Sequence, residues 1–264
     1  MLPDLQALAQ KIREIARAEI LPRFERVGYE LKSDGSILTE ADLAANQRIY
    51  DYLQQAYPSI HFLSEEMDEA TQEGLLRTAD SLWCLDPLDG TSNFAAGVPL
   101  FATALALFQQ GEVVLSLTYD PVRDEMFTAA KGQGAWLNGR RLHCHASGFA
   151  LDKAVALVDF KRLPKALKQA LLDEMPFGSQ RNLGTCALEW AWMAANRGHV
   201  YVHGGMKLWD LAAGSLLLAE AGGYACTLEG EAVCRPALGL RSAVASPDKA
   251  LFDAWYGFLH AYVR

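Results

Sequence analysis

One segment restricts the fold of this chain more than any other, because a strand-like apolar stretch runs directly into a pair of aspartates. Residues 81–85 are mostly apolar and lead into the run Asp86-Pro87-Leu88-Asp89-Gly90-Thr91. Proline fixes its own φ and pushes the residue before it into an extended conformation, so the backbone is expected to turn sharply here. The carboxylates of Asp86 and Asp89 can then converge, with the carbonyl of Leu88 exposed between them. Such an oxygen cluster suits a hard cation such as Mg²⁺.

The two residues that follow the aspartates suit an anion. Gly90 and Thr91 are predicted to begin a helix, whose free backbone N–H groups could hold a phosphate. An ordinary turn is the alternative explanation for the whole run, since Asp, Pro and Gly are all turn formers.

Two further acidic segments count against an ordinary turn. Ser64-Glu65-Glu66 follows a short apolar strand, and paired acids are poor turn material. Trp209-Asp210 begins an apolar helix, although Asp210 could also serve only as an N-cap residue. Both segments favour a functional role for the Asp86 run.

The rest of the chain alternates between helical and strand patterns. An amphipathic helix is predicted over residues 4–27, because apolar side chains recur at helical spacing. A second helix is predicted from Thr39 to about Tyr57, with Asp42 at the capping-box distance. Further helices are predicted over 68–78, 164–174, 185–196, 209–221 and 248–262. Strands are predicted over 60–63, 81–85, 101–109, 112–119, 124–130, 154–160, 199–203 and 241–246, with another near Gln180 and hairpin turns at 32–36 and 138–139.

This order of elements predicts one domain over residues 1–264. Its N-terminal α+β half extends to about residue 145 and contains a helix pair and an antiparallel-rich sheet. Its C-terminal α/β half covers about 146–264. Elements in this order favour stacked layers of helices and sheets.

Charge and composition limit the partners that we expect. The formal net charge is −8, which counts against a nucleic-acid partner, because such proteins usually present a basic face. It does not exclude an anionic substrate, since a divalent cation can supply positive charge locally.

Cysteine usage and hydropathy favour a cytoplasmic protein. None of the five cysteines lies in a Cys-x-x-Cys pair, so we expect buried thiols in a reducing compartment. The first residues lack the features of a signal peptide. No apolar run approaches the roughly 18 residues of a membrane span, so no membrane partner is predicted.

Together the three acidic segments resemble the inositol monophosphatase superfamily of metal-dependent, lithium-sensitive phosphatases. One signature is Asp86-Pro87-Leu88-Asp89-Gly90-Thr91-Ser92-Asn93-Phe94, and the other is Trp209-Asp210-Leu211-Ala212-Ala213-Gly214. The glutamate pair precedes the first signature by about 20 residues, as in that family. The resemblance implies a layered αβαβα sandwich of the sugar-phosphatase type and a homodimer.

The same resemblance implies roles for individual residues. Glu65, Asp86 and the Leu88 carbonyl would bind one Mg²⁺, while Asp86, Asp89 and Asp210 would bind a second. A third, weaker ion would lie near Glu65, and Asp89 and Asp210 would also face the substrate.

The attacking water and the phosphate would be held by other residues. Glu65 and Thr91 would orient the water with help from Asp42, and the amides of Gly90 and Thr91 would hold the phosphate. Two metal ions suit this reaction because they stabilise the attacking and the leaving oxygens of a phosphate ester.

The match to the family is weakest in the substrate pocket. The loop 181–187 resembles the family loop whose backbone contacts the alcohol, with Gly184 and Cys186 at the contacting positions. His203 stands where inositol-specific members carry a glutamate. It could donate to a hydroxyl, favour a more anionic substrate if protonated, or simply be packed. Lys161 lies near the expected second substrate contact and is otherwise a solvated surface lysine.

The sequence therefore predicts a metal-dependent phosphomonoesterase that hydrolyses a small phosphorylated polyol such as inositol 1-phosphate. Alternatives within this class are 3′(2′),5′-bisphosphate nucleotidase and fructose-1,6-bisphosphatase. The alternative from another class is a non-catalytic regulatory or binding protein on the same fold.

Overall fold

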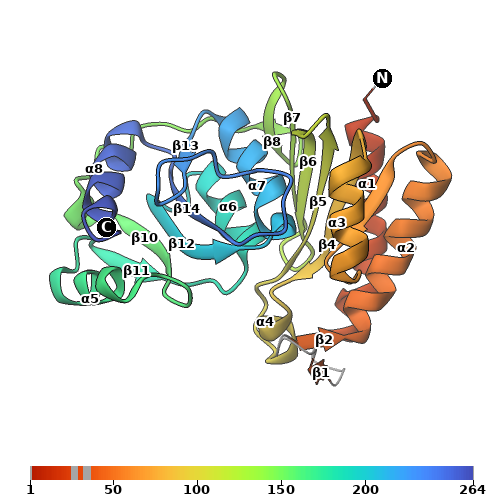
Figure 1. Cartoon of the computed structure of the whole chain (residues 1–264), viewed down its shortest axis with the longest axis horizontal. Helices are drawn as coiled ribbons and strands as arrows, with labels where there is room; N and C mark the ends of the chain where they lie inside the picture. Colours follow the sequence, from red (N-terminus) through yellow and green to blue (C-terminus); the bar gives the residue numbers. More distant parts are fainter. Residues whose placement is uncertain (1, 25–28, 32–36, 264) are drawn as a thin grey trace.

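Two β-sheets and three layers of helices alternate in the computed structural model, which describes residues 2–24, 29–31 and 37–263. Figure 1 shows the order: α1 and α2, the larger sheet, α6 and α7, the smaller sheet, and then α5 and α8. The predicted αβαβα sandwich is therefore confirmed.

The larger sheet has the strand order β3-β4-β5-β6-β7-β8-β9. Only β3 and β4 pair in parallel, and every later neighbour pairs antiparallel. The strands are β3 (His61–Ser64), β4 (Ser81–Asp89), β5 (Ala102–Gln109), β6 (Glu112–Asp120), β7 (Glu125–Ala130), β8 (Gly134–Leu137) and β9 (Arg140–Arg141). The hairpin predicted at Asn138-Gly139 joins β8 to β9, and both residues have the positive φ that a tight hairpin turn requires.

Two helices cover the outer face of this sheet. They are α1 (Leu5–Glu19), which begins at an Asp4 cap, and α2 (Glu40–Ala56). The predicted capping box of α2 is confirmed, since Asp42 Oδ2 accepts from the backbone N–H of Thr39 at 2.8 Å. Both helices bury their apolar sides against the sheet in one hydrophobic core.

The helix predicted over residues 4–27 is wrong at its C-terminal end. The structure ends α1 at Glu19 and continues with a 3-10 helix at Leu21–Arg23 that contains Pro22. Proline has no backbone N–H for the helical ladder, and its ring clashes with the carbonyl four residues earlier, so α1 cannot pass through it.

Two short strands lie between α1 and α2 in the chain. They are β1 (Tyr29–Leu31) and β2 (Ile37–Thr39), which pair antiparallel. The turn predicted at residues 32–36 lies outside the described residues. A short helix, α3 (Glu69–Thr78), follows β3 and begins at an Asp68 cap.

The smaller sheet has the strand order β11-β10-β12-β14-β13. Its strands are β10 (Val155–Asp159), β11 (Ser179–Arg181), β12 (Val200–Met206), β13 (Tyr224–Cys226) and β14 (Arg241–Ser246). β10 is parallel to β11 and β12, whereas β14 is antiparallel to β12 and β13. The sequence did not predict β13, a short edge strand that follows two glycines and has little apolar pattern.

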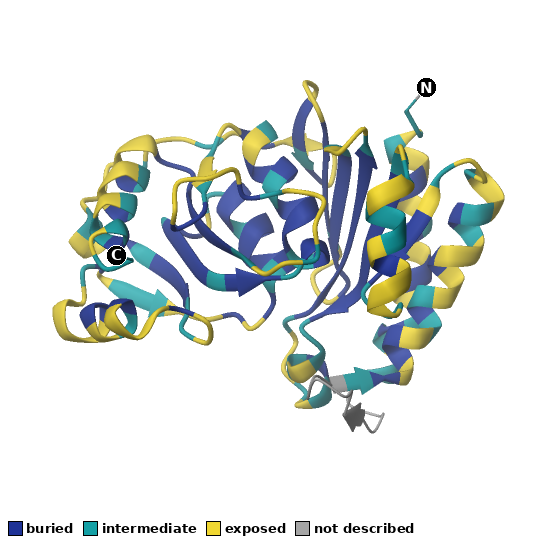
Figure 2. Cartoon of the chain, viewed as in Figure 1, coloured by how far each residue is buried: buried dark blue, intermediate teal, exposed yellow. Residues whose placement is uncertain are grey.

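Helices separate and flank the sheets. The inner pair is α6 (Cys186–Ala194) and α7 (Leu208–Ala221), and the outer pair is α5 (Lys165–Glu174) and α8 (Lys249–His260), with a 3-10 turn at Leu151–Lys153 before β10. α7 is apolar on almost every side because it is buried between the sheets (Figure 2). Gly214 allows α7 to approach α6, since a Cβ there would lie 2.2 Å from Trp190 Cβ.

The two sheets lie on either side of residue 145, the predicted boundary between the halves. That the halves form a single domain stays a prediction. Within the described part of the chain, no helix has both the length and the apolarity needed to cross a bilayer.

Candidate metal centre and active site

Three carboxylates from two separate elements meet where the end of β4 approaches the start of α7. Oxygen atoms of Asp86, Asp89 and Asp210 all lie within 4.8 Å of one another. Asp86 and Asp89 come from the end of β4, and Asp210 comes from the first turn of α7. The structure therefore brings together the three aspartates that the sequence selected.

The end of β4 differs from the predicted turn. The strand continues to Asp89, and its pairing with β5 shifts register between Asp86 and Asp89. The carbonyl of Pro87 accepts from Thr103 Oγ1 at 2.8 Å, and the N–H of Leu88 donates to Asp86 Oδ1 at 3.1 Å. A β-bulge, instead of a turn after the strand, aims both carboxylates at one point.

Helix N-termini hold two of the three aspartates. Asp89 Oδ2 accepts from the Thr185 hydroxyl and from the N–H of Ala187 at 2.7 Å, both at the start of α6. Asp210 Oδ2 accepts from the N–H of Lys207 at 2.8 Å, at the start of α7. The positive end of a helix dipole stabilises a carboxylate there. The contact of Thr185 with Asp89 was not apparent from the sequence, which placed Thr185 only as the first residue of the helix predicted over 185–196; in the structure it is the N-cap of α6.

Burial and mutual repulsion raise the pKa of these groups. The pKa of Asp86 lies well above its usual range because of burial, and the charges of Glu65 and Asp89 raise it further. The pKa of Asp210 is raised by burial and by the same two neighbours. Crowded buried carboxylates are costly unless a cation neutralises them. The donor set, which is all oxygen, fits Mg²⁺.

Glu65 approaches this cluster from the next strand. Its N–H donates to the carbonyl of Leu85 at 3.1 Å, which continues the pairing of β3 with β4. Its carboxylate is close enough to raise the pKa of both Asp86 and Asp210. The carbonyl of Leu88 also lies at the site, where it accepts from Thr91 Oγ1 at 3.0 Å.

Asp42 and Thr91 are brought together across 49 residues of sequence. Thr91 Oγ1 lies 3.2 Å from Asp42 Oδ1. The other oxygen of Asp42 accepts from the N–H and the hydroxyl of Thr39, at 2.8 and 2.6 Å. The capping box of α2 therefore fixes the carboxylate and directs its Oδ1 at Thr91.

Gly90 connects the aspartates to a short helix, α4 (Thr91–Ala95). Its φ is +90°, and a Cβ at this position would lie 2.9 Å from the carbonyl oxygen of Leu100. Only glycine fits this backbone without strain. The predicted helix start at Gly90-Thr91 is confirmed, with the N–H of Phe94 donating to the Gly90 carbonyl at 3.0 Å.

The loop before α6 lies beside the same site. Asn93 donates to the carbonyl of Leu183 at 2.7 Å, and Gly184 has a φ of +69° with its N–H on Asn182 Oδ1 at 2.9 Å. Glu189 Oε1 accepts from the N–H of Leu183 at 2.9 Å from within α6. Burial raises the pKa of Glu189 to about 8. The sequence placed Glu189 in a helix but gave no sign of this support of the loop.

Cys186 follows this loop as the first residue of α6 and is half-buried. Burial raises the pKa of its thiol, as do the charges of Asp210 and Asp89. The thiol is therefore protonated at neutral pH. The predicted contact through the Cys186 backbone remains compatible with this position.

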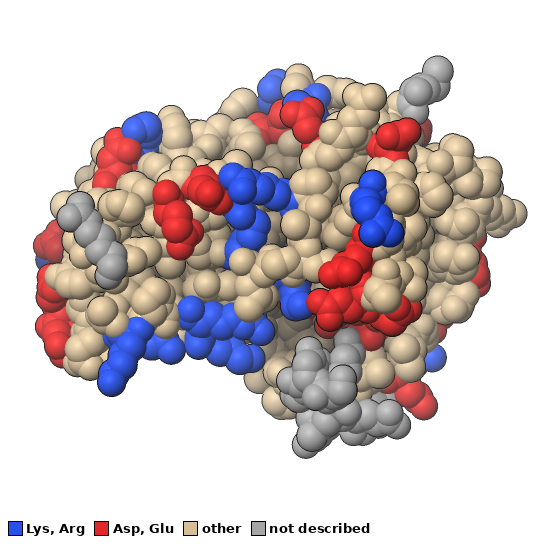
Figure 3. Space-filling model, in the orientation of Figure 1, with Lys and Arg blue, Asp and Glu red and all other residues tan. Residues whose placement is uncertain are grey.

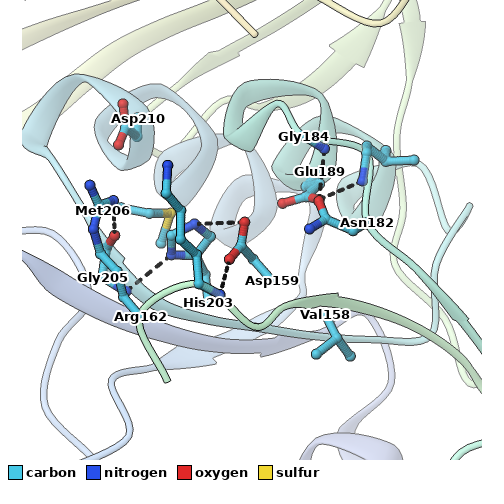
Figure 4. Close-up of polar contacts among 12 residues, drawn as sticks. Val158, Asp159, Arg162, Asn182, Gly184, Glu189, His203, Gly205, Met206 and Asp210 are labelled. Atoms are coloured by element: carbon cyan, nitrogen blue, oxygen red, sulfur yellow. Dashed lines mark hydrogen bonds and ion pairs between the residues drawn. The ribbon is translucent and has the colours of Figure 1, made fainter. Parts of the chain in front are cut away.

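His203 is packed into the wall of the site at 4% exposure. Its Nδ1 accepts from the N–H of Gly205 at 3.1 Å, and its Nε2 faces Asp159 at 3.7 Å (Figure 4). Burial lowers the pKa of His203 to about 4, and this outweighs the charge of Asp159. The ring is therefore uncharged at neutral pH, which leaves no cation at His203 to attract an anionic substrate.

Arg162 is the cation whose charge reaches the carboxylate cluster on this side, and the sequence did not single it out. Its Nη1 donates to the carbonyl of Gly205 at 2.8 Å, and its charge lowers the pKa of Asp210. Lys161, which was selected, is exposed, and its N–H donates to Asp159 Oδ1 at 2.6 Å. The side chain whose charge acts on Asp210 thus belongs to the neighbouring residue, Arg162.

Comparison with known proteins agrees with this geometry. The family model described as "Inositol monophosphatase family" matches residues 3–262. The chain belongs to the inositol monophosphatase family. The resemblance inferred from the two signatures is thereby confirmed. The chain is accordingly a phosphatase of a metal-dependent family.

Relatives in this family have two kinds of name. An inositol-1-monophosphatase of Mesorhizobium japonicum is 37% identical over 213 residues, which cover 78% of this chain and 77% of the relative. The Nus factor SuhB of Pseudomonas aeruginosa is 36% identical over 218 residues, covering 80% and 79%.

Solved structures of the family share the fold over nearly the whole chain. The extragenic suppressor protein SuhB of Bartonella henselae has a TM-score of 0.81 at 30% identity and covers 96% of this chain and 95% of its own. The IMPase of Thermotoga maritima has a TM-score of 0.84 at 27% identity, with coverage of 98% and 97%. An IMPase/NADP phosphatase solved with Mg²⁺ and phosphate has a TM-score of 0.82 at 24% identity, with coverage of 97% and 93%.

Proposed function

We propose that this chain is a Mg²⁺-dependent phosphomonoesterase that hydrolyses a small phosphorylated polyol such as inositol 1-phosphate. The observation that carries the proposal is the cluster of Asp86, Asp89 and Asp210, whose oxygens lie within 4.8 Å of one another. With Glu65 and the Leu88 carbonyl, these residues would hold two or three Mg²⁺ ions.

The bound ions would neutralise the charge of the phosphate and lower the pKa of a water that attacks it. The chain's own residues would orient that water. Thr91 Oγ1 has one proton and two acceptors, Asp42 Oδ1 at 3.2 Å and the Leu88 carbonyl at 3.0 Å. When the proton points to Asp42, the lone pairs of Oγ1 can accept from the water, and Glu65 would accept from its other side.

Backbone groups would position the phosphate. Gly90 is the N-cap of α4 and Thr91 is its first residue, so no helical carbonyl is available to their N–H groups, which would donate to the phosphate. The carboxylates of Asp89 and Asp210 would then lie between the phosphate and the alcohol. Such catalysis depends on positioning and charge neutralisation, and it needs no covalent phosphoenzyme.

A bisphosphate is the second candidate substrate within this class, as in 3′(2′),5′-bisphosphate nucleotidase or fructose-1,6-bisphosphatase. The cation Arg162 beside Asp210 favours it, since the pocket wall carries positive charge while His203 is uncharged.

A regulatory role is the candidate from another class. Relatives at 33–36% identity are named Nus factor SuhB, and a binding protein could retain the fold without the reaction. The buried carboxylates count against this alternative, because clustered like charges destabilise a protein that binds no cation there.

The resemblance to the family also supports a homodimer and inhibition by Li⁺, while the cysteine usage, net charge and hydropathy of the sequence support a cytoplasmic location with no nucleic-acid or membrane partner. We propose these as accompanying features. Sedimentation of the purified chain and the effect of Li⁺ on phosphate release test the first two.

The test of the proposed function is Asp89→Asn, assayed by phosphate release from inositol 1-phosphate with Mg²⁺ present. The change removes a ligand charge with little change in volume, and kcat/KM is expected to fall by about 100-fold or more. The control is Asp173→Asn on the exposed side of α5, which should retain wild-type activity.

Two results would contradict the proposal. Unchanged activity in Asp89→Asn would remove this cluster from the reaction. A wild-type protein that releases no phosphate from any monoester with Mg²⁺ present would favour the regulatory role.

A further inference from the structure

Opposite Asp210, the side of the site that contains Arg162, His203 and Gly205 carries a cation without an acidic partner. In the described part of the chain, many cations form ion pairs with Asp or Glu, as Arg13, Arg23 and Arg48 do. Six cations of the C-terminal half form no ion pair among the described residues, whereas the others there do, and the six are Lys161, Arg162, Lys165, Lys168, Arg181 and Lys207. Figure 3 shows Lys and Arg side chains gathered along the lower edge of the C-terminal half.

Arg162 differs from the other five because the fold fixes its position. The backbone of Arg162 packs on Gly204, where a Cβ would lie 2.2 Å from the Arg162 carbonyl carbon. Its side chain then runs along Gly205 and donates to the Gly205 carbonyl at 2.8 Å. The Gly205 carbonyl can accept this hydrogen bond because β12 shifts register against β14 between His203 and Met206.

The guanidinium of Arg162 is near both the carboxylate cluster and His203. Its charge acts on both Asp210 and His203, and Figure 4 shows Arg162 beside Gly205 and Met206 on the side of Asp210. One of its five N–H groups is used by Gly205, and no carboxylate in the described ranges pairs with the others. A planar, exposed guanidinium of this kind suits a phosphate, which it can bind through two parallel hydrogen bonds.

The neighbouring residues do not offer a competing ligand for hydroxyl groups. His203 Nδ1 is occupied by the Gly205 N–H, and its Nε2 side faces Asp159. Asp159 in turn accepts from the N–H of Lys161. The wall therefore presents a fixed cation to the part of the substrate that remains after the phosphate is cleaved.

We propose that Arg162 is a specificity-determining residue that binds a second phosphate group, so that the enzyme prefers bisphosphorylated small molecules to monophosphates. The inference rests on the proposed phosphomonoesterase function and adds the substrate class. The hydrolysed phosphate is held at the Asp86–Asp89–Asp210 cluster, and the second phosphate is bound but not cleaved.

The test compares substrates that differ by one phosphate. The pairs are fructose 1,6-bisphosphate with fructose 1-phosphate, and adenosine 3′,5′-bisphosphate with adenosine 3′-monophosphate, each assayed by phosphate release with Mg²⁺. In at least one pair the wild type is expected to prefer the bisphosphate by about tenfold or more in kcat/KM, the usual effect of a charge-assisted hydrogen bond.

Arg162→Gln should lower kcat/KM for the bisphosphate about tenfold more than for its monophosphate, mainly through KM. Arg162→Lys should restore part of the preference, because it retains the charge. Lys165→Gln, an exposed cation at the start of α5, is the matched control and should keep the wild-type ratio.

The outcomes separate the two proposals. A wild type that hydrolyses monoesters but prefers no bisphosphate, or an Arg162→Gln variant that loses both activities equally, overturns the role of Arg162 and leaves the phosphatase intact. A wild type that hydrolyses none of the four compounds, nor inositol 1-phosphate, overturns the proposed function itself.

Discussion

At the scale of single residues, several side chains hold the site in place without facing the substrate. Glu189 is the clearest, because it lies buried at 1% exposure in α6 and accepts from the N–H of Leu183 in the pocket loop. Burial raises its pKa to about 8 from an ordinary value of 4.5. The folded protein therefore keeps a proton on Glu189 at a pH where the unfolded chain has lost it.

This shift has a defined effect on stability. The contribution of Glu189 is fully present below pH 4.5 and is lost as pH rises through about 8, because the folded state binds the extra proton in this window. Glu189→Gln keeps an acceptor for Leu183 but carries no charge. We expect it to raise the free energy of unfolding at pH 8.5, by at most about 5 kcal/mol, and to change it little at pH 5.

Urea unfolding with EDTA present, at the two pH values, measures this difference. Glu73→Gln in α3 is the control, since Glu73 is exposed. Equal effects of Glu189→Gln at pH 5 and pH 8.5 would show that Glu189 is already ionised in the folded protein.

At the scale of elements, the turn from β4 into α4 controls the geometry of the centre. Gly90 has a φ of +90°, and a Cβ there would press on Leu100 and on Thr185, whose hydroxyl holds Asp89. We expect Gly90→Ala to lower kcat/KM by about tenfold or more, because it would shift both Asp89 and the amides that we propose to hold the phosphate. It should also destabilise the fold by about 1–3 kcal/mol.

A matched control separates the two effects. Gly139 also has a positive φ, +78°, but a Cβ added there would meet no atom within 4 Å. Gly139→Ala should therefore lower the stability only through the strained backbone conformation, and it should keep full activity. Activity measurements alongside thermal unfolding of both variants test this, and equal activity losses would contradict a steric role for Gly90.

Elements were predictable from the sequence where local chemistry decides them. The α2 capping box depends on Thr39 and Asp42, three residues apart, and the Asn138-Gly139 hairpin depends on two adjacent residues. The β-bulge at the end of β4 was not predictable, because it forms only when β4 pairs with β5. Pro22 could have indicated the early end of α1, but the apolar spacing of the helix continues up to it.

The same distinction between local sequence and strand pairing applies to the candidate site. Its aspartates could be selected because two signatures carry them in sequence, whereas the surroundings of His203 depend on which strands become neighbours. Asp159 faces His203 because β10 pairs in parallel with β12 at these two residues. The approach of Arg162 depends on the absence of a side chain at Gly204, in β12.

At the scale of the whole molecule, the candidate metal centre connects parts of the fold that are far apart in sequence. Asp86 and Asp89 end a strand of the larger sheet, and Asp210 begins the helix that packs between the two sheets. Without a cation, repulsion among these buried carboxylates opposes the packing of the two halves. A ligand that binds only the folded state stabilises it by mass action.

Mg²⁺ is therefore expected to raise the melting temperature of the wild type relative to protein in EDTA. At about 100 times the dissociation constant the gain is roughly 2.7 kcal/mol, which for a chain of this size corresponds to about 5–10 °C. Asp86→Asn removes a negative charge at the most buried position of the cluster. Its melting temperature should rise much less with Mg²⁺, and in EDTA it should lie above that of the wild type. Differential scanning fluorimetry across a Mg²⁺ titration gives both values. A melting temperature for the wild type that does not depend on Mg²⁺ would mean that the clustered carboxylates are accommodated without a cation, and that the folded centre is protonated instead.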